Sequence, residues 1–446
     1  MATSRNTRRI ALVDSFTDFV HSEVASSVVL LVCSIVALAW ANSPWSETYE
    51  EVLHTPLSIG LGTYRFSLSL HHWINDALMG IFFFVVGLEI KRELVVGHLS
   101  TVKQAMLPVV AAAGGMLLPA VIYAGLNHAG PGAPGWGIPT ATDIAFALGV
   151  LALLGSRVPI GLKVFLTAVA IADDIGAVLV IAIFYTERIA WIGLVLAAVF
   201  LVLLYIAIGP LRWRTPGVLA ILVTGVWIGV FASGIHSTIA GVLIACLVPV
   251  RTRIHPADVL ELARLRLDVL DRKELTRDSM LEKRDQYATI EELYDAVSDL
   301  RPANLALEQY FHPISAFVVL PLFALANAGV TLDRGKFALF SSPVAWGILL
   351  GLVIGKQLGI AFFTWLVVRV GGARLPAGVT WAQVYGVSCL AGIGFTMALF
   401  VSDLAFDDEL LISAAKLGIL SASLFSAAIG FSVLHRVLPP RADAAD

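Results

Sequence analysis

The chain has 446 residues, of which 58% are hydrophobic and 14% are charged, and its formal net charge is −3. A soluble domain carries about 25% charged residues, so this composition excludes an ordinary soluble protein and predicts a membrane protein with many spans. The small net charge gives no sign of a nucleic-acid ligand, and the three cysteines lie in apolar runs, which favours packing over disulfide bonding.

Twelve apolar segments are long enough to cross a bilayer, alone or with slight tilt. They lie near residues 24–42, 73–90, 105–127, 137–155, 164–185, 189–209, 216–234, 236–250, 313–330, 343–368, 384–405 and 410–435. Only Ser233-Gly234-Ile235 separates the seventh from the eighth, and the eighth is short. We therefore predict an all-α polytopic membrane protein with about twelve transmembrane helices.

The stretch LSIGLGTYRFSLSL, residues 57–70, connects the first two segments. Apolar residues alternate on both sides of Gly62-Thr63, which predicts a small β-hairpin near 57–70. An isolated hairpin is marginal in water, so it needs a surface to pair with. Two interpretations remain open: a flap over its own subunit, or edge-to-edge dimerisation.

Charge is concentrated in the segment from Arg251 to Ala303, which contains 22 of the 63 charged residues. Alternating charges with periodic leucines are typical of a solvated or interfacial helix. We interpret 251–303 as a charged insert. It divides the membrane domain into a first part, 1–250 with helices 1–8, and a second part, 304–446 with helices 9–12.

The basic residues indicate which way the chain faces. Outside the spans and the insert, fourteen lysines and arginines lie on the side of the N-terminus and four lie on the other side. Cytoplasmic loops carry the excess of basic residues. We therefore expect both termini and the insert to be cytoplasmic and the hairpin to be external.

Two adjacent aspartates, Asp173 and Asp174, interrupt the fifth apolar segment. They are the tenth and eleventh of the 22 residues from Val164 to Tyr185, near the middle of a bilayer about 30 Å thick. A carboxylate at that depth costs about 3 kcal/mol on insertion scales, so the pair indicates a functional site. Lys356 lies at similar depth and is expected to pair with an aspartate. A purely structural ion pair is the alternative, but it accounts for only one of the two.

The fourth and eleventh segments each carry a signal for an interrupted helix. The fourth contains PTATD, which ends in Thr142 and Asp143, and the eleventh contains Gly392 and Gly394. Helix ends exposed at membrane depth carry partial charges, which Asp143 and Lys356 could neutralise. The two segments are seven apart, which suits two inverted repeats that cross at the midplane. For the glycines, simple close packing is the alternative.

A charged cluster, Glu89, Arg92 and Glu93, ends the second segment. Its ordinary interpretation is a helix terminus with a basic anchor. Glu308, which precedes the ninth segment, and His236, which opens the eighth, could join it in a titratable network.

Several motifs together resemble one known family, the NhaA family of bacterial sodium/proton antiporters. They are WINDALMGIFFFVVGLEIKREL (73–94), PTATDIAFALGVLALLG (139–155), AIADDIGAVLVIAIFY (170–185), GIHSTIAGVLI (234–244), HPISAFVVLPLFALANAGV (312–330), GKQLGIAFFTW (355–365) and VSCLAGIGFTMALFVSDLAF (387–406). Because they occur in the right order over nearly the whole membrane portion, the resemblance is far more specific than any one motif.

The resemblance implies inverted repeats with interrupted, crossing fourth and eleventh helices, and a homodimer built partly on the external hairpin. It implies that Asp174 binds Na⁺ and carries protons, with Asp173 as its partner. Lys356 matches the midplane lysine of the family. Thr142 and Asp143 match residues at the helix crossing.

The resemblance also ties five residues to pH activation: Glu89, Arg92, Glu93, His236 and Glu308. Two features depart from the family pattern. The insert 251–303 is longer than the usual connection, and Asn304 and Leu305 stand about one turn before Glu308, where the family often has a basic residue.

We therefore expect an electrogenic, pH-activated Na⁺(Li⁺)/H⁺ antiporter that exports sodium in exchange for protons. Asp173, Asp174 and Thr142 would hold the cation in an oxygen cage for which protons compete. A sodium-coupled solute symporter is the alternative, although the midplane has no surplus of polar side chains for a solute.

The same residues give expectations about enzymatic activity, partners and location. The adjacent aspartates do not match an intramembrane protease, so we expect no enzyme activity and no cofactor beyond the transported ions. The expected partners are a monovalent cation, protons, the lipid bilayer and a second copy of the chain, but no nucleic acid. The expected location is the bacterial cytoplasmic membrane.

Overall fold

The computed structural model describes residues 24–61, 64–186, 189–209, 211, 215–251, 256–271, 288–294, 301–331 and 342–439. Among these residues, nine helices are long and apolar enough to cross a membrane, and a bent pair forms a tenth span. They are Val24–Ala41, Leu70–Val95, Val102–Leu126, Ala133–Ala152, Ile160–Phe184, Trp191–Ile208, Ala303–Asn327, Pro343–Val370, Glu409–Val437, and the pair Trp381–Leu390 with Phe395–Ala405.

Two shorter apolar helices, α9 (Pro216–Ala232) and α10 (Ile239–Leu247), occupy the seventh and eighth expected segments. Each of the twelve expected segments therefore has a helical counterpart, and the all-α membrane fold is confirmed. At nine residues, α10 spans only about 14 Å and cannot cross a bilayer by itself.

Of the ten spans, five are continuous helices and five are built from shorter pieces. The continuous ones are Val24–Ala41, α5 (Val102–Leu126), α7 (Ile160–Phe184), α8 (Trp191–Ile208) and α20 (Glu409–Val437). The second span joins α3 (Leu70–His72), the π-helical turn η1 (Trp73–Leu78) and α4 (Met79–Val95). The fourth joins the 3₁₀ helix η2 (Ala133–Thr140) to α6 (Ile144–Ala152).

The ninth and tenth spans each contain a π-helical turn. The ninth consists of α14 (Ala303–Ile314), η4 (Ser315–Val319) and α15 (Leu320–Asn327). The tenth consists of α16 (Pro343–Leu350), η6 (Gly351–Gly355) and α17 (Lys356–Val370). The bent pair is α18 (Trp381–Leu390) and α19 (Phe395–Ala405). Because π-helical turns in α-helices are rare and frequent at functional sites, the turn directly before Lys356 draws attention to that residue.

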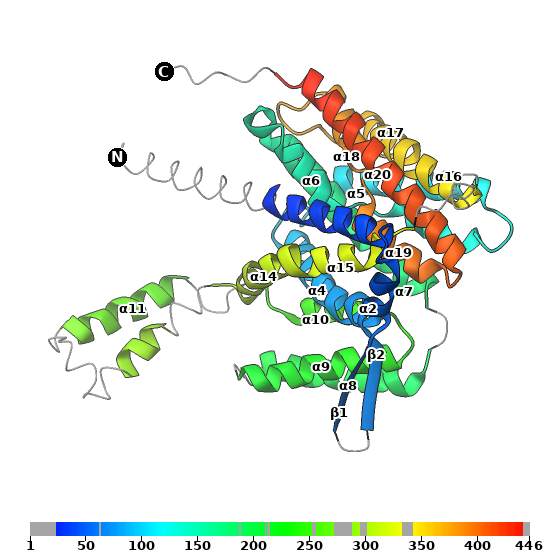
Figure 1. The fold of residues 1–446 in the computed structure, drawn as a ribbon. Coiled ribbons are helices and arrows are strands. Elements are labelled where there is room, and N and C mark those ends of the chain that lie inside the picture. The colour runs from blue at the N-terminus through cyan, green and yellow to red at the C-terminus, as the bar shows by residue number, and fades with distance from the viewer. Residues whose placement is uncertain are drawn as a thin grey trace.

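The helices pack in two groups. In one, α5 packs against α7, α16 and α17, and α20 packs against α16 and α18. In the other, α4 packs against α10 and α14, and α8 packs against α9. Figure 1 shows the first group in the upper part of the molecule and the pair α8–α9 as the lowest of the helices, with the hairpin strands reaching below them. The helix α7 also contacts α4, so it lies where the two groups meet.

The expected hairpin is present. Strands β1 (Pro56–Leu61) and β2 (Tyr64–Ser69) pair antiparallel, with Leu57 opposite Leu68, while Gly62-Thr63 lies outside the described residues. The preceding helix α2 (Ser46–His54) leads into it. We call the end of the bundle that holds residues 70–76, 327–331 and 403–408 the hairpin face, and the end that holds residues 89–98 and 301–312 the insert face.

The charged insert emerges at the insert face. Its described parts are α11 (Pro256–Asp271), which lies beyond the end of α14 in Figure 1, and the helical residues 288–294. An ion pair of 2.9 Å between Arg266 and Glu292 joins them. The rest of 252–300 and the basic residues of the N-terminus lie outside the described residues, so the expected orientation of the chain stays a prediction.

Glycines allow α17 to pack directly on the backbone of α5. A Cβ atom on Gly355 would lie 2.8 Å from Cα of Pro119, and one on Gly115 would lie 2.8 Å from Cγ1 of Ile360. A Cβ on Gly359 would meet the carbonyl of Gly114. The two helices therefore touch main chain to main chain, which is the close approach that small residues permit in membrane helices.

Arg157 fastens the end of the fourth span to the end of the last one. It belongs to the 3₁₀ turn η3 (Gly155–Arg157). Its Nη2 donates to the carbonyls of His435 (2.8 Å) and Leu438 (2.9 Å), and its Nε donates to the carbonyl of Pro439 (2.8 Å). A cation on the last carbonyls of α20 is favourable, because they are unpaired and carry partial negative charge.

Candidate functional site

The fourth span breaks where the sequence predicts it. The 3₁₀ helix η2 contains Pro139 and ends at Thr140, and Ala141 has extended backbone with φ −80° and ψ 146°. Asp143 then caps α6, because its carboxylate accepts a hydrogen bond of 3.1 Å from the backbone N–H of Phe146.

The eleventh span breaks between Leu390 and Phe395, and the axes of α18 and α19 differ by 48°. Gly392 lies inside this connection, where a Cβ would come within 2.6 Å of Oγ of Ser426. Gly394 directly precedes α19. The break and the close packing therefore occur together, and the two interpretations of the glycines are not exclusive.

The two breaks cross in direct contact. The backbone N–H of Asp143 donates to the carbonyl of Ile393 (2.6 Å), and Oγ1 of Thr142 donates to the carbonyl of Ala391 (2.9 Å). The backbone N–H of Thr396 donates to Oδ2 of Asp143 (3.0 Å), and the hydroxyl of Thr396 donates to the same oxygen. One carboxylate therefore serves the N-termini of both α6 and α19, which is the expected role of Asp143.

Asp173 and Asp174 lie in the middle of α7, and they are only 2% and 4% exposed. Nζ of Lys356 lies 2.7 Å from Oδ2 of Asp173 and donates a second bond of 2.7 Å to Oγ1 of Thr142. Lys356 thus reaches the crossing through the Thr142 hydroxyl. The expected pairing of lysine and aspartate is present, and Asp173 is the partner.

Asp174 is in a different position from its neighbour. No hydrogen bond joins its carboxylate to another residue in the part of the chain that the structure describes, and Oδ1 of Asp173 has no hydrogen-bond partner there either. Successive helix residues point about 100° apart, so Lys356 cannot serve both carboxylates equally. Carboxylate and hydroxyl oxygens, such as those of Asp174, Asp173 and Thr142, are the ligand type that hard cations take.

A second cluster lies at the insert face. Nε of Arg92 is 3.1 Å from Oε2 of Glu308, and Nδ1 of His312 is 3.7 Å from Oε1 of Glu89. Asn304, at a departure from the family pattern, is buried and donates to the carbonyl of Leu88 (3.1 Å). Three of the five expected pH-response residues therefore meet here, together with His312, which the sequence reasoning missed although it stands one turn after Glu308.

Glu93 makes its bonds to the loop that follows α4, while its charge still acts on Glu308. Its Oε2 accepts the backbone N–H of His98 (2.8 Å) and lies 3.5 Å from Nδ1 of that histidine, another residue that the sequence reasoning missed. Lys91, which lies between Glu89 and Arg92 in sequence, donates to the carbonyls of Cys246 (2.6 Å) and Val248 at the end of α10.

His236 lies at the other end of the molecule, near the hairpin face. Its ring packs edge-on against Phe400 with centroids 5.7 Å apart, and the hydroxyl of the next residue, Ser237, donates to Oδ1 of Asp76 (2.8 Å). Asp76 belongs to η1 at the start of the second span, whereas Glu89 is near its end. The structure therefore does not bring His236 together with the insert-face cluster.

Comparison with known proteins assigns the chain to a family. Residues 17–434 match the family described as Na⁺/H⁺ antiporter 1. The chain belongs to this family. The Na⁺/H⁺ antiporter NhaA of Sulfurimonas denitrificans is 45% identical over 421 residues, which cover 93% of this chain and 94% of that protein.

Two further relatives agree in extent. NhaA of Oleidesulfovibrio alaskensis is 46% identical over 428 residues, covering 96% of this chain and 94% of that protein. NhaA 2 of Sorangium cellulosum is 47% identical over 424 residues, covering 95% and 90%. All three are named as antiporters, so the symporter alternative has no support.

Proposed function

We propose that this protein exchanges Na⁺ or Li⁺ for protons across the bacterial cytoplasmic membrane and that it catalyses no covalent reaction. The observation that carries the proposal is the buried Asp174 carboxylate, which no described side chain pairs, beside the ion pair of Asp173 with Lys356 and against the crossing of two broken helices. Membership of an antiporter family and the names of the relatives support the same function.

In this mechanism, the cation and the proton compete for the same oxygens. When Asp174 is protonated, its carboxyl group is neutral and needs no counter-charge. When it loses the proton, a Na⁺ or Li⁺ ion replaces it, held by Asp174 together with Oδ1 of Asp173 and the oxygen of Thr142. The site then opens to the opposite side, releases the cation and returns protonated.

Lys356 makes the exchange electrogenic in this proposal. A cation that also draws on Asp173 weakens the 2.7 Å ion pair, and Lys356 then releases a proton of its own. Two protons would thereby move for each cation, so that each cycle carries net charge. The test is whether exchange in sealed vesicles responds to an imposed membrane potential.

The insert-face cluster supplies the proposed pH response. The ion pair between Arg92 and Glu308 joins α4 to α14, and both helices reach the same end of the bundle as α11. A change of charge on Glu308, Glu89 or His312 would change how these helices hold together, which gives cytoplasmic pH a route to the transport rate.

The hairpin supplies the proposed dimer contact. Two strands leave two unpaired edges, and the sheet in the described residues contains only β1 and β2. A second copy with its hairpin placed edge to edge would satisfy one of them. A variant that lacks residues 57–68 should run as a monomer in detergent, whereas the full chain should run as a dimer.

The deciding experiment uses purified protein in proteoliposomes that are acidic inside and contain a pH-sensitive dye. Addition of NaCl or LiCl outside should restore the dye signal, and KCl should not. Asp174→Asn should abolish the recovery. Asp407→Asn, which alters an exposed carboxylate near the hairpin face, is the matched control and should leave it intact. Sodium-dependent exchange that persists in Asp174→Asn would falsify the assignment of the site.

A further inference from the structure

A polar network at the hairpin face joins three spans that are far apart in sequence. Nε2 of His71 lies 2.9 Å from Oδ1 of Asn327, and Nδ2 of Asn327 donates to Oδ1 of Asn75 (2.8 Å). Nδ2 of Asn75 donates to Oδ2 of Asp403 (3.1 Å) and back to Asn327 (3.3 Å). We call these four residues the hairpin-face network. It connects the second, ninth and eleventh spans.

The helix α19 connects this network mechanically to the cation site. Thr396, in its first turn, binds the carboxylate of Asp143, and Asp403 lies seven residues later, about 10 Å along the helix. Phe400, between them, packs against Phe83 and Phe323 of the second and ninth spans. Any shift of α19 at the crossing therefore pulls on the bond between Asp403 and Asn75.

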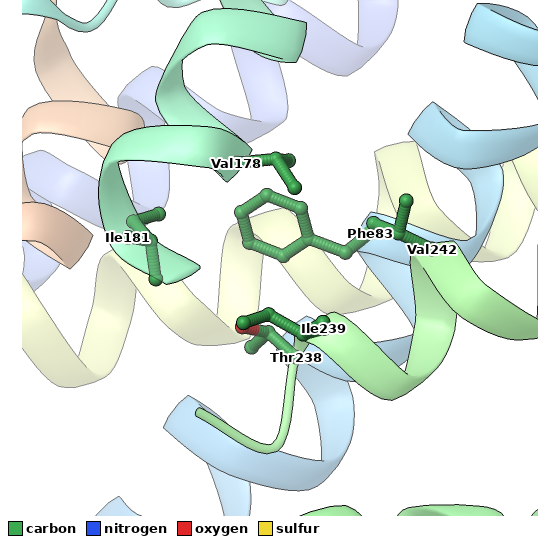
Figure 2. Close-up of a pocket in the computed structure, with 6 residues that line it drawn as sticks. All are labelled: Phe83, Val178, Ile181, Thr238, Ile239 and Val242. Atoms are coloured by element: carbon green, nitrogen blue, oxygen red, sulfur yellow. The ribbon is translucent and has the colours of Figure 1, made fainter. Parts of the chain in front are cut away.

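On the hairpin-face side of Asp174, apolar side chains gather around α7. Figure 2 shows the ring of Phe83 directed toward Val178 and Ile181 of α7, with residues of α10 beside it. Val178 stands one helical turn beyond Asp174, so this contact begins directly next to the site. The hairpin-face network thus spans the same boundary that must open for a cation to leave on this side.

The shorter of two contacts at Nε2 favours one neutral form of His71. Nδ2 of Asn327 donates to Asn75 and to the carbonyl of Phe323 (3.0 Å), so Oδ1 of Asn327 is the acceptor. The 2.9 Å contact of this oxygen with Nε2 of His71 favours the tautomer with hydrogen on Nε2, although Nδ2 of Asn75 also lies 3.4 Å from that nitrogen. In the neutral ring this leaves Nδ1 to accept a proton. His71 is only partly buried, so protons from the hairpin face can reach it.

Charged groups from several elements face this ring. Burial opposes a positive charge on His71 most strongly, and Lys416 of α20 and the adjacent His72 also repel it, whereas Asp403 of α19 attracts it. Asp403 itself lies near Tyr49 of α2, whose hydroxyl donates to the carbonyl of Leu325 (2.8 Å). Protonation of Nδ1 keeps the bond to Asn327 and adds the attraction of Asp403.

We propose that His71 is a proton-binding site on the hairpin face, separate from Asp173 and Asp174, and that its protonation strengthens the hairpin-face network and slows opening on that side. The proposal rests on the proposed antiport. It gives the transporter a response to pH on the hairpin side in addition to the response at the insert face.

The test compares variants in vesicles with a known orientation. A protease site inserted between Gly62 and Thr63 is cut from the bath only where the hairpin face is outside, which measures that orientation. Sodium exchange is followed while the bath pH on the hairpin side is varied from about 5.5 to about 8, a range that includes the ordinary pKa of histidine. The interior pH is fixed, and rates are expressed relative to wild type at each pH, which cancels the common driving force.

His71→Gln keeps a donor but cannot titrate, so its rate relative to wild type should rise about two- to fivefold on acidification, the range of a partly exposed ion pair. Asp403→Asn should move the midpoint of the wild-type response to lower pH, and Lys416→Gln should move it to higher pH. His54→Gln, an exposed histidine on α2, is the matched control and should follow wild type.

A constant ratio of His71→Gln to wild type at every pH would overturn the proposal. Shifts of Asp403→Asn and Lys416→Gln in the same direction would do so as well, and these two variants keep the test decisive if His71→Gln does not fold. If wild-type protein shows no exchange at any pH, the antiport function itself is overturned. This outcome is distinct from failure of the His71 proposal, in which wild type still exchanges sodium.

Discussion

The ammonium of Lys356 and Oδ2 of Asp173 lie 2.7 Å apart, and neither side chain is more than 3% exposed. Charges taken out of water at this depth are stable only as a pair, because each loses its hydration. The ion pair therefore fixes the geometry of the site in addition to any part it plays in transport, and it leaves the adjacent Asp174 as the carboxylate without a permanent partner.

Replacing Lys356 alone should lower the free energy of unfolding, and replacing Lys356 and Asp173 together should restore most of it. Lys356→Gln leaves Asp173 buried and unpaired, and should destabilise the protein by about 3 kcal/mol. Lys356→Gln combined with Asp173→Asn should recover most of this loss. Thermal unfolding in detergent measures both, and equal melting temperatures for the single and the double variant would contradict the pairing.

The carboxylate of Asp143, at the crossing, should be needed both for stability and for exchange. Asp143→Ala removes the acceptor for the backbone N–H groups of Phe146 and Thr396, and should destabilise the fold by about 1–2 kcal/mol and abolish exchange. Asp143→Asn keeps an acceptor without the charge, so its stability and its exchange rate should lie between those of wild type and of Asp143→Ala. Thermal unfolding and the dye assay check this order. If Asp143→Asn loses as much stability and exchange as Asp143→Ala, the charge alone is decisive.

The pH-response residues should divide into two energetic groups. Arg92→Ala and Glu308→Gln should each shift the pH midpoint of exchange, and their combination should be non-additive because the side chains are in contact. His236→Gln combined with Glu308→Gln should be additive, since His236 lies near the opposite end of α4. Exchange rates measured over a pH series give these shifts, and strong coupling between His236 and Glu308 would argue against the division.

Arg157 should affect stability without changing the cation site. Arg157→Ala removes three hydrogen bonds to the end of α20 and should cost about 1 kcal/mol, a modest value because the side chain is partly exposed. Arg157→Lys keeps the charge and should lose less. The apparent affinity for Na⁺ should be unchanged in both variants. A changed affinity in folded Arg157→Ala would show that the clamp reaches the site.

Local signals in the sequence were sufficient for the spans and for both helix breaks. Proline and threonine before Asp143, and the paired glycines after Leu390, disfavour regular helix at the backbone itself, so the breaks can be predicted without knowledge of the fold. The hairpin was predicted for the same reason, because the alternation around Gly62-Thr63 is local. Hydropathy located α10 but overstated its length, since residues 236–238 precede the helix as a turn and residues 248–250 continue the apolar run beyond its end.

Relationships between distant segments were harder to predict. Depth alone brought Lys356 to the level of the aspartates, but the choice of Asp173 over Asp174 depends on the rotation of α7 against α17. His236 and Glu308 are both titratable residues near the ends of spans, and their sequence neighbours do not indicate that one lies near the hairpin face and the other at the insert face. His98 and His312 were missed because a surface histidine gains meaning only from the carboxylate that folding places beside it.

The main-chain contact between α5 and α17 restricts how this protein can be altered. Around most binding sites, a change of preferred ion can be sought by enlarging or shrinking the surrounding side chains. Behind Lys356 the helices meet at Gly115, Gly355 and Gly359, where even an added Cβ would collide with the facing helix. Variants with a new cation preference should therefore arise on α7 or in the stretch Ala141–Asp143, and a search confined to the glycine-lined wall should recover only inactive proteins.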